Sequence, residues 1–324
     1  MRNRRKRNAV LLSFLLVVSV TVLFVTLVVW LRNVFMLEHR SRLFGSTYMT
    51  MDNQYFEVLN AFIENYVEVN GDRLITRDPA SSQVKQNEQI LDMLDMGVDF
   101  IFINPVDGHN AEPALRECVK RGVPFIAVDT EIYGQARPVS TVISDNYEAG
   151  VLIARDLASK RKEARVVVLY DNKISSTCTR FKGFTDTLDA LSFPYDIIYT
   201  ASGTTLLHET MVEMQKFLNL HLDFDVVFGG NDPTALGALA AMHNNNVWSG
   251  QLVYGIDGSP SGKMMVSQGF MEATAAQYPS EIAFESVSAA YSYLDGKSVP
   301  DMIVVPVRMI SKDTVDSITV MGWQ

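Results

Sequence analysis

The sequence predicts an α/β fold in which parallel strands alternate with helices, preceded by an apolar N-terminal segment. Short runs rich in β-branched and aromatic residues alternate with stretches of about a dozen residues that carry apolar side chains at helical spacing. Most of the strand-like runs are continuously apolar, which is typical of strands covered by helices on both faces. The chain has 324 residues, 48% of them hydrophobic, so it is long enough for about two domains.

The N-terminal segment has the length and composition of a membrane span. Residues 9–31 carry no charge, and as a helix they reach about 35 Å, more than the roughly 30 Å of a bilayer core. Six basic residues and no acidic one lie within the first 32 residues, which places the N-terminus in the cytoplasm by the positive-inside rule. The alternative is a cleaved signal peptide, but its apolar region is only about 7–15 residues long.

We therefore expect a single-pass membrane protein with a signal anchor and an extracytoplasmic binding domain. Its first three parts are a cytoplasmic basic segment, a transmembrane helix and a juxtamembrane linker at residues 1–8, 9–31 and 32–42.

The remaining elements follow in alternation. Strands are expected at residues 73–78, 99–105, 123–129, 164–171, 225–232 and 252–258. Helices are expected at residues 55–69, 84–96, 111–121, 149–161, 206–218 and 234–244. Gly97 and Gly122 directly follow two of these helices, where glycine commonly ends them.

Polar side chains stand where several of these strands end. Asn104, Asp129 and Asp257 each close a run, and Asn231 and Asp232 close another. Asp and Asn also cap helices and close turns, so each alone has a structural explanation. In parallel α/β sheets, however, ligands bind at the carboxyl ends of the strands, and the recurrence at equivalent positions favours one shared cleft.

Charge and cysteine content exclude several classes of protein. Beyond residue 32, the chain has 22 basic and 37 acidic residues, and so acidic a body would repel a phosphate backbone. Nucleic acid is therefore not an expected partner. Cys118 and Cys178 allow at most one disulfide, and Cys178 is interpreted as a small packing residue.

No enzyme motif stands out. The segment GSPSGK at residues 258–263 is one residue short of a phosphate-binding loop, and Met264 stands where a Ser or Thr would meet magnesium. The five histidines form neither a zinc-protease motif nor part of a nucleophile elbow. The sequence predicts that the protein is not an enzyme and has no catalytic residue, metal site or cofactor.

Eight stretches of the exported part resemble, in order, segments of a known family: the type 1 periplasmic sugar-binding proteins of the ribose and galactose kind. This family comprises the substrate-binding components of ATP-driven ABC importers. The resemblance runs from about Phe44 to Val307. The stretches are MDNQYF (51–56), INPVDGHNA (103–111), FIAVDTE (125–131), ISDNYEAG (143–150), TRFKGF (179–184), FGGNDPTALGAL (228–239), VYGIDGSPSG (253–262) and ATAAQYP (273–279).

The resemblance implies the periplasmic binding protein type 1 architecture of two similar, doubly wound parallel-sheet lobes. Three hinge crossovers join the lobes, near Ser144, Gln277 and Pro306. The implied boundaries are residues 43–144 plus 278–306 for lobe 1 and residues 145–277 plus 307–324 for lobe 2.

The resemblance also implies a ligand between the lobes. The family's sugar contacts fall on Asn53, Tyr55, Phe56, Asp129, Arg180, Asn231, Asp257 and Gln277. These residue types suit a sugar in their own right, because carboxylates accept from hydroxyls, guanidinium donates, amides do both and an aromatic ring covers an apolar face. Arg180 as a solvated surface residue and Phe56 as a core residue are the alternatives.

Two positions depart from the ribose-binding pattern. Thr130, also a predicted site residue, stands where the ribose binders have arginine, and Thr204 or Thr205 stands where they have a second-lobe aromatic residue. The expected ligand is therefore a monosaccharide rather than ribose in particular.

The expected function is capture of this sugar for delivery to an ABC permease, with the membrane contacted through the N-terminal helix. Presentation of the sugar to a membrane histidine kinase or chemoreceptor is the alternative. A scaffold that binds protein instead of solute is disfavoured, because nearly all of the expected polar contacts are present.

Overall fold

The computed structural model describes residues 15–30, 41–203 and 205–323. The chain divides into two compact units, residues 1–42 and residues 43–324. In the first unit, the described residues 15–30 form a helix.

The predicted transmembrane helix is wrong. Among the residues that the structure describes, no helix is long and apolar enough to cross a membrane. The helix over 15–30 would reach only about 24 Å, less than the roughly 30 Å of a bilayer core. Residues 1–14 and 31–40, which include the rest of the predicted span and most of the predicted linker, lie outside the described residues.

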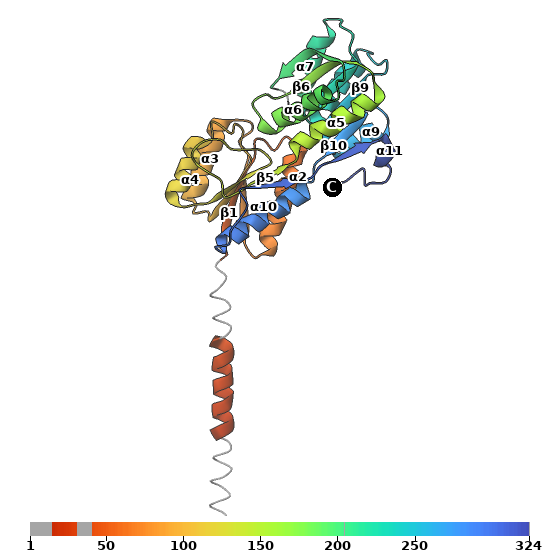
Figure 1. Cartoon of the computed structure of the whole chain (residues 1–324). Coiled ribbons are helices and arrows are strands. Elements are labelled where there is room, and N and C mark those ends of the chain that lie inside the picture. The colour runs from red at the N-terminus through yellow and green to blue at the C-terminus, as the bar shows by residue number, and fades with distance from the viewer. Residues whose placement is uncertain (1–14, 31–40, 204, 324) are drawn as a thin grey trace, which may run out of the picture. The chain divides into compact units, whose positions relative to one another are not determined.

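The first lobe of the second unit is built on a six-stranded parallel sheet (Figure 1). Its strands, in spatial order, are β11 (Met302–Val305), β5 (Thr141–Ser144), β4 (Phe125–Val128), β3 (Phe100–Ile103), β1 (Leu43–Thr47) and β2 (Arg73–Arg77). The helices of this lobe are α2 (Gln54–Val69), α3 (Gln83–Asp95), α4 (Glu112–Arg121) and α10 (Pro279–Leu294).

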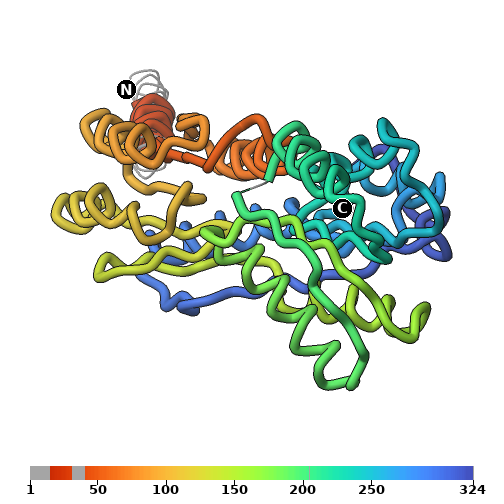
Figure 2. The backbone as a smooth tube through the Cα atoms, turned by 90° about the horizontal axis from the view of Figure 1, so that it is seen from above, coloured from red at the N-terminus to blue at the C-terminus, as the bar shows by residue number. Residues whose placement is uncertain are grey.

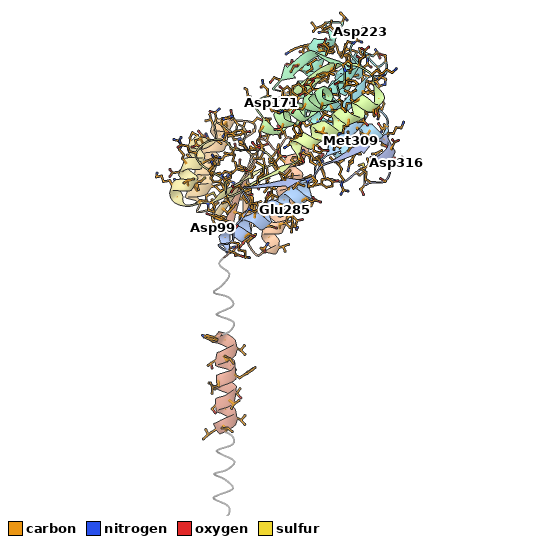
Figure 3. The ribbon with its side chains drawn as sticks, in the orientation of Figure 1. Asp99, Asp171, Asp223, Glu285, Met309 and Asp316 are labelled. Carbon is orange, nitrogen blue, oxygen red and sulfur yellow. The ribbon has the colours of Figure 1, made fainter. Side chains whose placement is uncertain are left out.

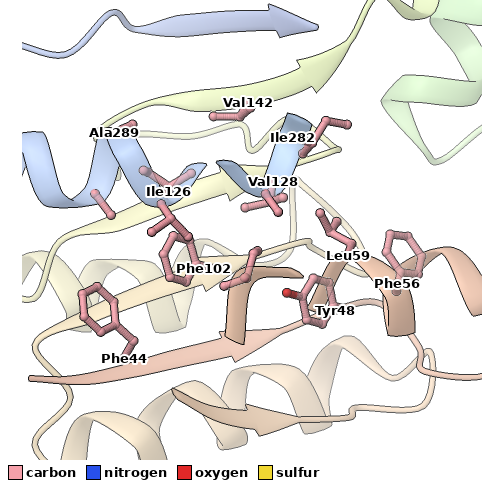
Figure 4. Packing of buried hydrophobic residues seen from close by; sticks show 14 of the residues in the cluster. Phe44, Tyr48, Phe56, Leu59, Phe102, Ile126, Val128, Val142, Ile282 and Ala289 are labelled. Carbon is pink, nitrogen blue, oxygen red and sulfur yellow. The ribbon is translucent and has the colours of Figure 1, made fainter. Parts of the chain in front are cut away.

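Alternating side chains of β3 bury both faces of this sheet. Phe100 and Phe102 pack in a cluster with Leu59 of α2 and Ile282 of α10 (Figure 4). Ile101 and Ile103, which point to the opposite face, belong to a second cluster with residues of α3 and α4. This period of two explains why a strand covered on both faces is continuously apolar.

The second lobe repeats the arrangement. Its strands, in spatial order, are β12 (Arg308–Ser311), β10 (Ala273–Ala276), β9 (Leu252–Asp257), β8 (Val226–Gly229), β6 (Ala164–Tyr170) and β7 (Tyr195–Ser202). All pairs are parallel except β10 with β12. The helices are α5 (Asn146–Lys160), α6 (Ser175–Ala190), α7 (Leu207–Leu218), α8 (Asp232–Asn244), α9 (Pro260–Ser267) and α11 (Lys312–Val315).

The second sheet is also buried on both faces. Val166 and Val168 of β6 pack in a cluster with residues of α5 and α6, including Phe184. Val167 and Leu169 point the other way, into a cluster with residues of α7 and α8. The lobe is therefore a three-layer helix, sheet, helix sandwich.

The chain passes three times between the two sheets (Figure 2). It does so between β5 and β6, between β10 and β11, and between β11 and β12.

Acidic side chains are spread over both lobes, and Figure 3 labels Asp99, Asp171, Asp223, Glu285 and Asp316 among them. Because all strands but β12 run parallel within their sheet, their carboxyl ends gather at one edge of each sheet, where the site lies.

Candidate ligand-binding cleft

One cavity is lined by all nine of the site residues predicted from the sequence. The space among them is about 380 Å³, a figure that includes the part open to solvent. Its lining consists of Met49, Asn53, Tyr55, Phe56, Asp129, Thr130, Ile174, Ser176, Thr177, Arg180, Thr205, Asn231, Asp257 and Gln277.

The first lobe contributes the start of α2 and the end of β4. Asn53 is the N-cap of α2, and its side-chain oxygen accepts from the Tyr55 backbone N–H at 3.0 Å. Phe56 lines the cavity and also belongs to the core of the lobe, so the core interpretation and the site interpretation both apply. Asp129 and Thr130 directly follow β4, and the Thr130 hydroxyl donates to Asp129 Oδ2 at 3.1 Å.

The second lobe contributes the ends of β9 and β10 and the starts of two helices. Asp257 is the last residue of β9, Gln277 follows β10, and Gln277 Nε2 donates to Asp257 Oδ1 at 2.7 Å. Asn231 is the N-cap of α8: its oxygen accepts from the Thr234 backbone N–H at 2.9 Å, and its nitrogen donates to the Thr205 carbonyl at 3.1 Å. Asn231 is thus a helix cap as well as a wall of the cavity.

Arg180 brings the only guanidinium in the lining of this cavity. Its side chain is 4% exposed, which contradicts the alternative of a solvated surface residue. Nε donates to Asn146 Oδ1 and Nη1 donates to the Gly230 carbonyl, each at 2.8 Å, and Nη1 lies 3.9 Å from Asp257 Oδ1. These contacts hold the planar group in one orientation, as preorganised recognition of hydroxyls requires.

The two lining carboxylates sit in strained, buried positions. Asp129 has a φ of 67° and Asp257 a φ of 144°, values that non-glycine residues rarely adopt. Burial raises the pKa of Asp129, while Arg180 acts in the opposite direction. Burial and then the neighbouring Asp232 carboxylate raise the pKa of Asp257 well above its usual value, against the effect of Arg180.

One buried acceptor of the lining, Oε1 of Gln277, lacks a hydrogen-bond partner among the described residues. The buried Tyr55 hydroxyl instead interacts with the Asp129 carboxylate. Burial, followed by the Asp129 and Asp257 carboxylates, raises the pKa of Tyr55, so this hydroxyl stays protonated. Buried polar groups in native proteins are nearly always paired, so the open acceptor on Gln277 suits a ligand that has hydroxyls.

Asn104 and Asp232, also singled out as strand ends, stand behind the cavity instead of lining it. Asn104 Nδ2 donates to the Val128 carbonyl at 3.1 Å and to Asp129 Oδ2 at 3.4 Å. The Asp232 backbone N–H donates to Asp257 Oδ2 at 3.3 Å. Both therefore orient a lining carboxylate from its far side.

Five residues that line the cavity were not predicted as site residues from the sequence. Met49, Ile174, Ser176 and Thr177 were missed, and Thr205 was considered only as a departure from the ribose pattern. Ser176 and Thr177 lie in the first turn of α6, directly after the β6 strand and its loop. The rule that ligands bind where strands end was the signal that could have found them.

The two lobes touch around this cavity. Ile174, which precedes α6 in the second lobe, packs in the core cluster of the first lobe. The backbone N–H of Glu131 donates to Ser175 Oγ at 3.3 Å across the same gap. The cavity is therefore enclosed by both lobes, which places its lining groups around a common centre.

Comparison with known proteins agrees with this architecture. Residues 44–298 match the family model described as periplasmic binding protein domain. The chain is 28% identical over 267 residues to the ribose import binding protein of Bacillus subtilis, covering 82% of this chain and 86% of that protein. It is 26% identical over 263 residues to the ribose import binding protein of Escherichia coli, with coverages of 81% and 88%.

Solved structures share the fold. An ABC transporter solute-binding protein from Mycobacterium smegmatis with bound glycerol aligns with a TM-score of 0.81 at 22% identity, covering 88% of this chain and 98% of that chain. The Caulobacter myo-inositol binding protein aligns with a TM-score of 0.80 at 22% identity, with coverages of 86% and 96%. The resemblance to type 1 periplasmic sugar-binding proteins is confirmed, and the chain belongs to the periplasmic binding protein domain family.

Proposed function

We propose that this protein captures a neutral monosaccharide or cyclic polyol between its lobes, outside the cytoplasm, and delivers it to an ABC importer. The observation that carries the proposal is the convergence of Asp129, Asp257 and Arg180, from separate parts of the chain, on one enclosed cavity. Each can replace water at a ligand hydroxyl with a charged hydrogen bond, which contributes about 1.5–3 kcal/mol.

The charge of the lining favours a neutral ligand. Two aspartates face one arginine, so the ionised cavity carries a net negative charge. An acidic sugar would add a buried like charge, which is costly when no cation pairs with it. A neutral ring instead satisfies Gln277 Oε1, since a sugar hydroxyl can donate to it.

The relatives narrow the panel of ligands to test. They include ribose import binding proteins, and structures of the same fold contain bound myo-inositol, D-allose and L-arabinofuranose. Thr130 and Thr205 alter the cavity relative to the ribose binders, so we propose the class of ligand and leave its identity to measurement.

Calorimetric titration of the purified protein with ribose, allose, arabinose, galactose and myo-inositol tests the proposal. We expect saturable binding of at least one of them, and loss of that binding in Asp129→Ala. Asp223→Ala is the matched control, because this side chain is 88% exposed and lies far from the lining. Absence of binding across the panel, with the protein folded, would contradict the proposal.

Delivery to an importer needs a test in cells. Deletion of the gene should abolish high-affinity uptake of the labelled ligand, and Asp129→Ala should not restore it. Normal uptake together with a lost transcriptional response to the ligand would instead support presentation to a sensor kinase. A protease-accessibility assay on spheroplasts, whose cytoplasmic membrane is intact, tests the location. An extracytoplasmic binding unit would be degraded.

A further inference from the structure

The C-terminal tail, defined here as residues 316–323, extends from the second lobe to the first. It follows α11, whose Val315 is buried in the second-lobe core, and Ile318 and Val320 pack against the same core. At its far end, Trp323 packs against the core cluster of the first lobe. Trp323 contacts Tyr55 of α2.

A buried lysine anchors the tail on the second lobe. Lys263 of α9 is 0% exposed. Its ammonium group donates to the carbonyl oxygens of Thr319 at 2.8 Å and Gly322 at 2.5 Å. A fully buried ammonium needs such partners, because removing it from water is costly. These two bonds fix the backbone on either side of Met321 and so aim the following Trp323.

Trp323 reaches the sugar site through Tyr55. The two rings meet edge to face, with centroids 5.7 Å apart and an interplanar angle of 62°. Tyr55 also meets Phe56 edge to face at 5.4 Å, so its ring is held on two sides. The hydroxyl of Tyr55 interacts with the Asp129 carboxylate in the cavity lining. Trp323 therefore contributes to the position of a ring whose hydroxyl meets a lining carboxylate.

Trp323 also forms the wall of a second hollow at the mouth of the cleft. This hollow is lined from the first lobe by Asp52, Asn53 and Gln54, and from the second lobe by residues that include Leu207 and Ser259. Opening of the lobes would separate these two sets of residues. The Trp323 side chain therefore stands at a hollow lined by residues of both lobes.

We propose that the C-terminal tail is a strap that holds the lobes closed, and that Trp323 is a positioning residue for the ligand site. The strap is carried by the second lobe through Lys263 and engages the first lobe through the edge contact of Trp323 with Tyr55. Its effect on ligand release rests on the proposed function. Its effect on lobe closure does not.

The test uses the full chain with Trp323→Ala, Trp323→Phe and the control Trp248→Ala. Trp248 is 44% exposed, meets Phe270 at 6.1 Å and does not line the cleft, so it controls for the loss of a tryptophan. Ligand dissociation is measured by stopped flow, using the sugar that binds in the calorimetric panel. A thermal melt verifies that each variant is folded.

We expect Trp323→Ala to release the sugar roughly 2- to 12-fold faster, the range set by one aromatic edge contact. Trp323→Phe should restore most of the slow release, and Trp248→Ala should match the unaltered protein. A purely structural role for Trp323 would lower the melting temperature but leave release unchanged. Unchanged release in Trp323→Ala, or equal acceleration in Trp248→Ala, would overturn the proposal.

Small-angle scattering without ligand separates this inference from the proposed function. If the strap holds the lobes together, Trp323→Ala should have a larger radius of gyration than the unaltered protein, and Trp248→Ala should not. Were no sugar to bind, the proposed function would fail while this comparison would still test the strap. Equal radii of gyration for Trp323→Ala and the unaltered protein would overturn the proposal that the tail holds the lobes closed.

Discussion

Gly150 allows α5 to approach α6 closely enough to position Arg180. A Cβ built on Gly150 lies 1.9 Å from the carbonyl oxygen of Arg180 and 2.6 Å from the backbone nitrogen of Phe184. The contact is reciprocal, because a Cβ on Gly183 of α6 would lie 2.1 Å from the carbonyl oxygen of Tyr147 on α5. Both obstacles are backbone atoms, which no rotamer change can remove.

The substitution Gly150→Ala therefore forces the two helices apart. Ordinary contact begins near 3.4 Å, so the 1.9 Å approach requires a shift of about 1.5 Å. Overpacking of this kind costs about 1–3 kcal/mol of stability. The Arg180 bond to Asn146 of α5, 2.8 Å long, would exceed hydrogen-bond distance after such a shift.

We expect two measurable effects from this one methyl group. The melting temperature should fall by roughly 2–12 °C, at about 2–4 °C per kcal/mol. Sugar affinity should fall roughly 10- to 150-fold, the value of one charged hydrogen bond from Arg180. Differential scanning calorimetry and titration calorimetry measure the two effects separately.

Ser159→Thr is the control, because it adds one methyl group at an exposed position of the same helix. It should change neither quantity appreciably. A Gly150→Ala protein that melts early but binds sugar with unchanged affinity would refute the reasoning, since the position of Arg180 would then not matter to the ligand.

Three further predictions concern single side chains of the site. Asp129→Ala and Asp257→Ala should each weaken sugar binding by roughly 1.5–3 kcal/mol in titration calorimetry, and unaltered affinity in both would mean that the cleft is misassigned. Asn231→Ala should lower stability by about 0.5–2 kcal/mol through loss of the α8 cap, and Asn231→Ser should recover most of it in the same thermal melt. Burial raises the pKa of Asp232 above 3.8 in the folded state, so the folded protein binds the proton more tightly and stability should fall as pH rises from near 3.8 through the raised pKa. Asp232→Asn should flatten the dependence of melting temperature on pH in that window. An unchanged dependence would contradict the attribution of this effect to Asp232.

Much of the fold, and the residues that line the cavity, were predictable from local sequence. Continuous apolar runs such as residues 100–103 are strands buried on both faces, and Asp129 and Asp257 stand where such strands end. The carboxyl ends of parallel strands lie at one edge of each sheet, so residues that follow such strands can be predicted to lie near one another.

Other features depend on contacts between distant residues. No local pattern distinguishes Asp257, which faces the cavity, from Asp232, whose oxygens accept from Ser259 and Thr274 behind it. The role of Trp323 depends on Lys263, 60 positions earlier in the chain. For the predicted membrane span over 9–31, the structure describes only residues 15–30, and among the described residues no helix is long and apolar enough to cross a membrane.

The central claim is that carboxylates and a guanidinium from both lobes surround one polyhydroxylated ring. A crystal structure of the protein with its tightest-binding sugar tests this claim most directly. The account predicts ring hydroxyl oxygens within hydrogen-bond distance of Asp129 and Asp257 from opposite lobes, with Arg180 donating to the same ring. A sugar bound elsewhere on the molecule, or bound between the lobes without touching these three side chains, would contradict it.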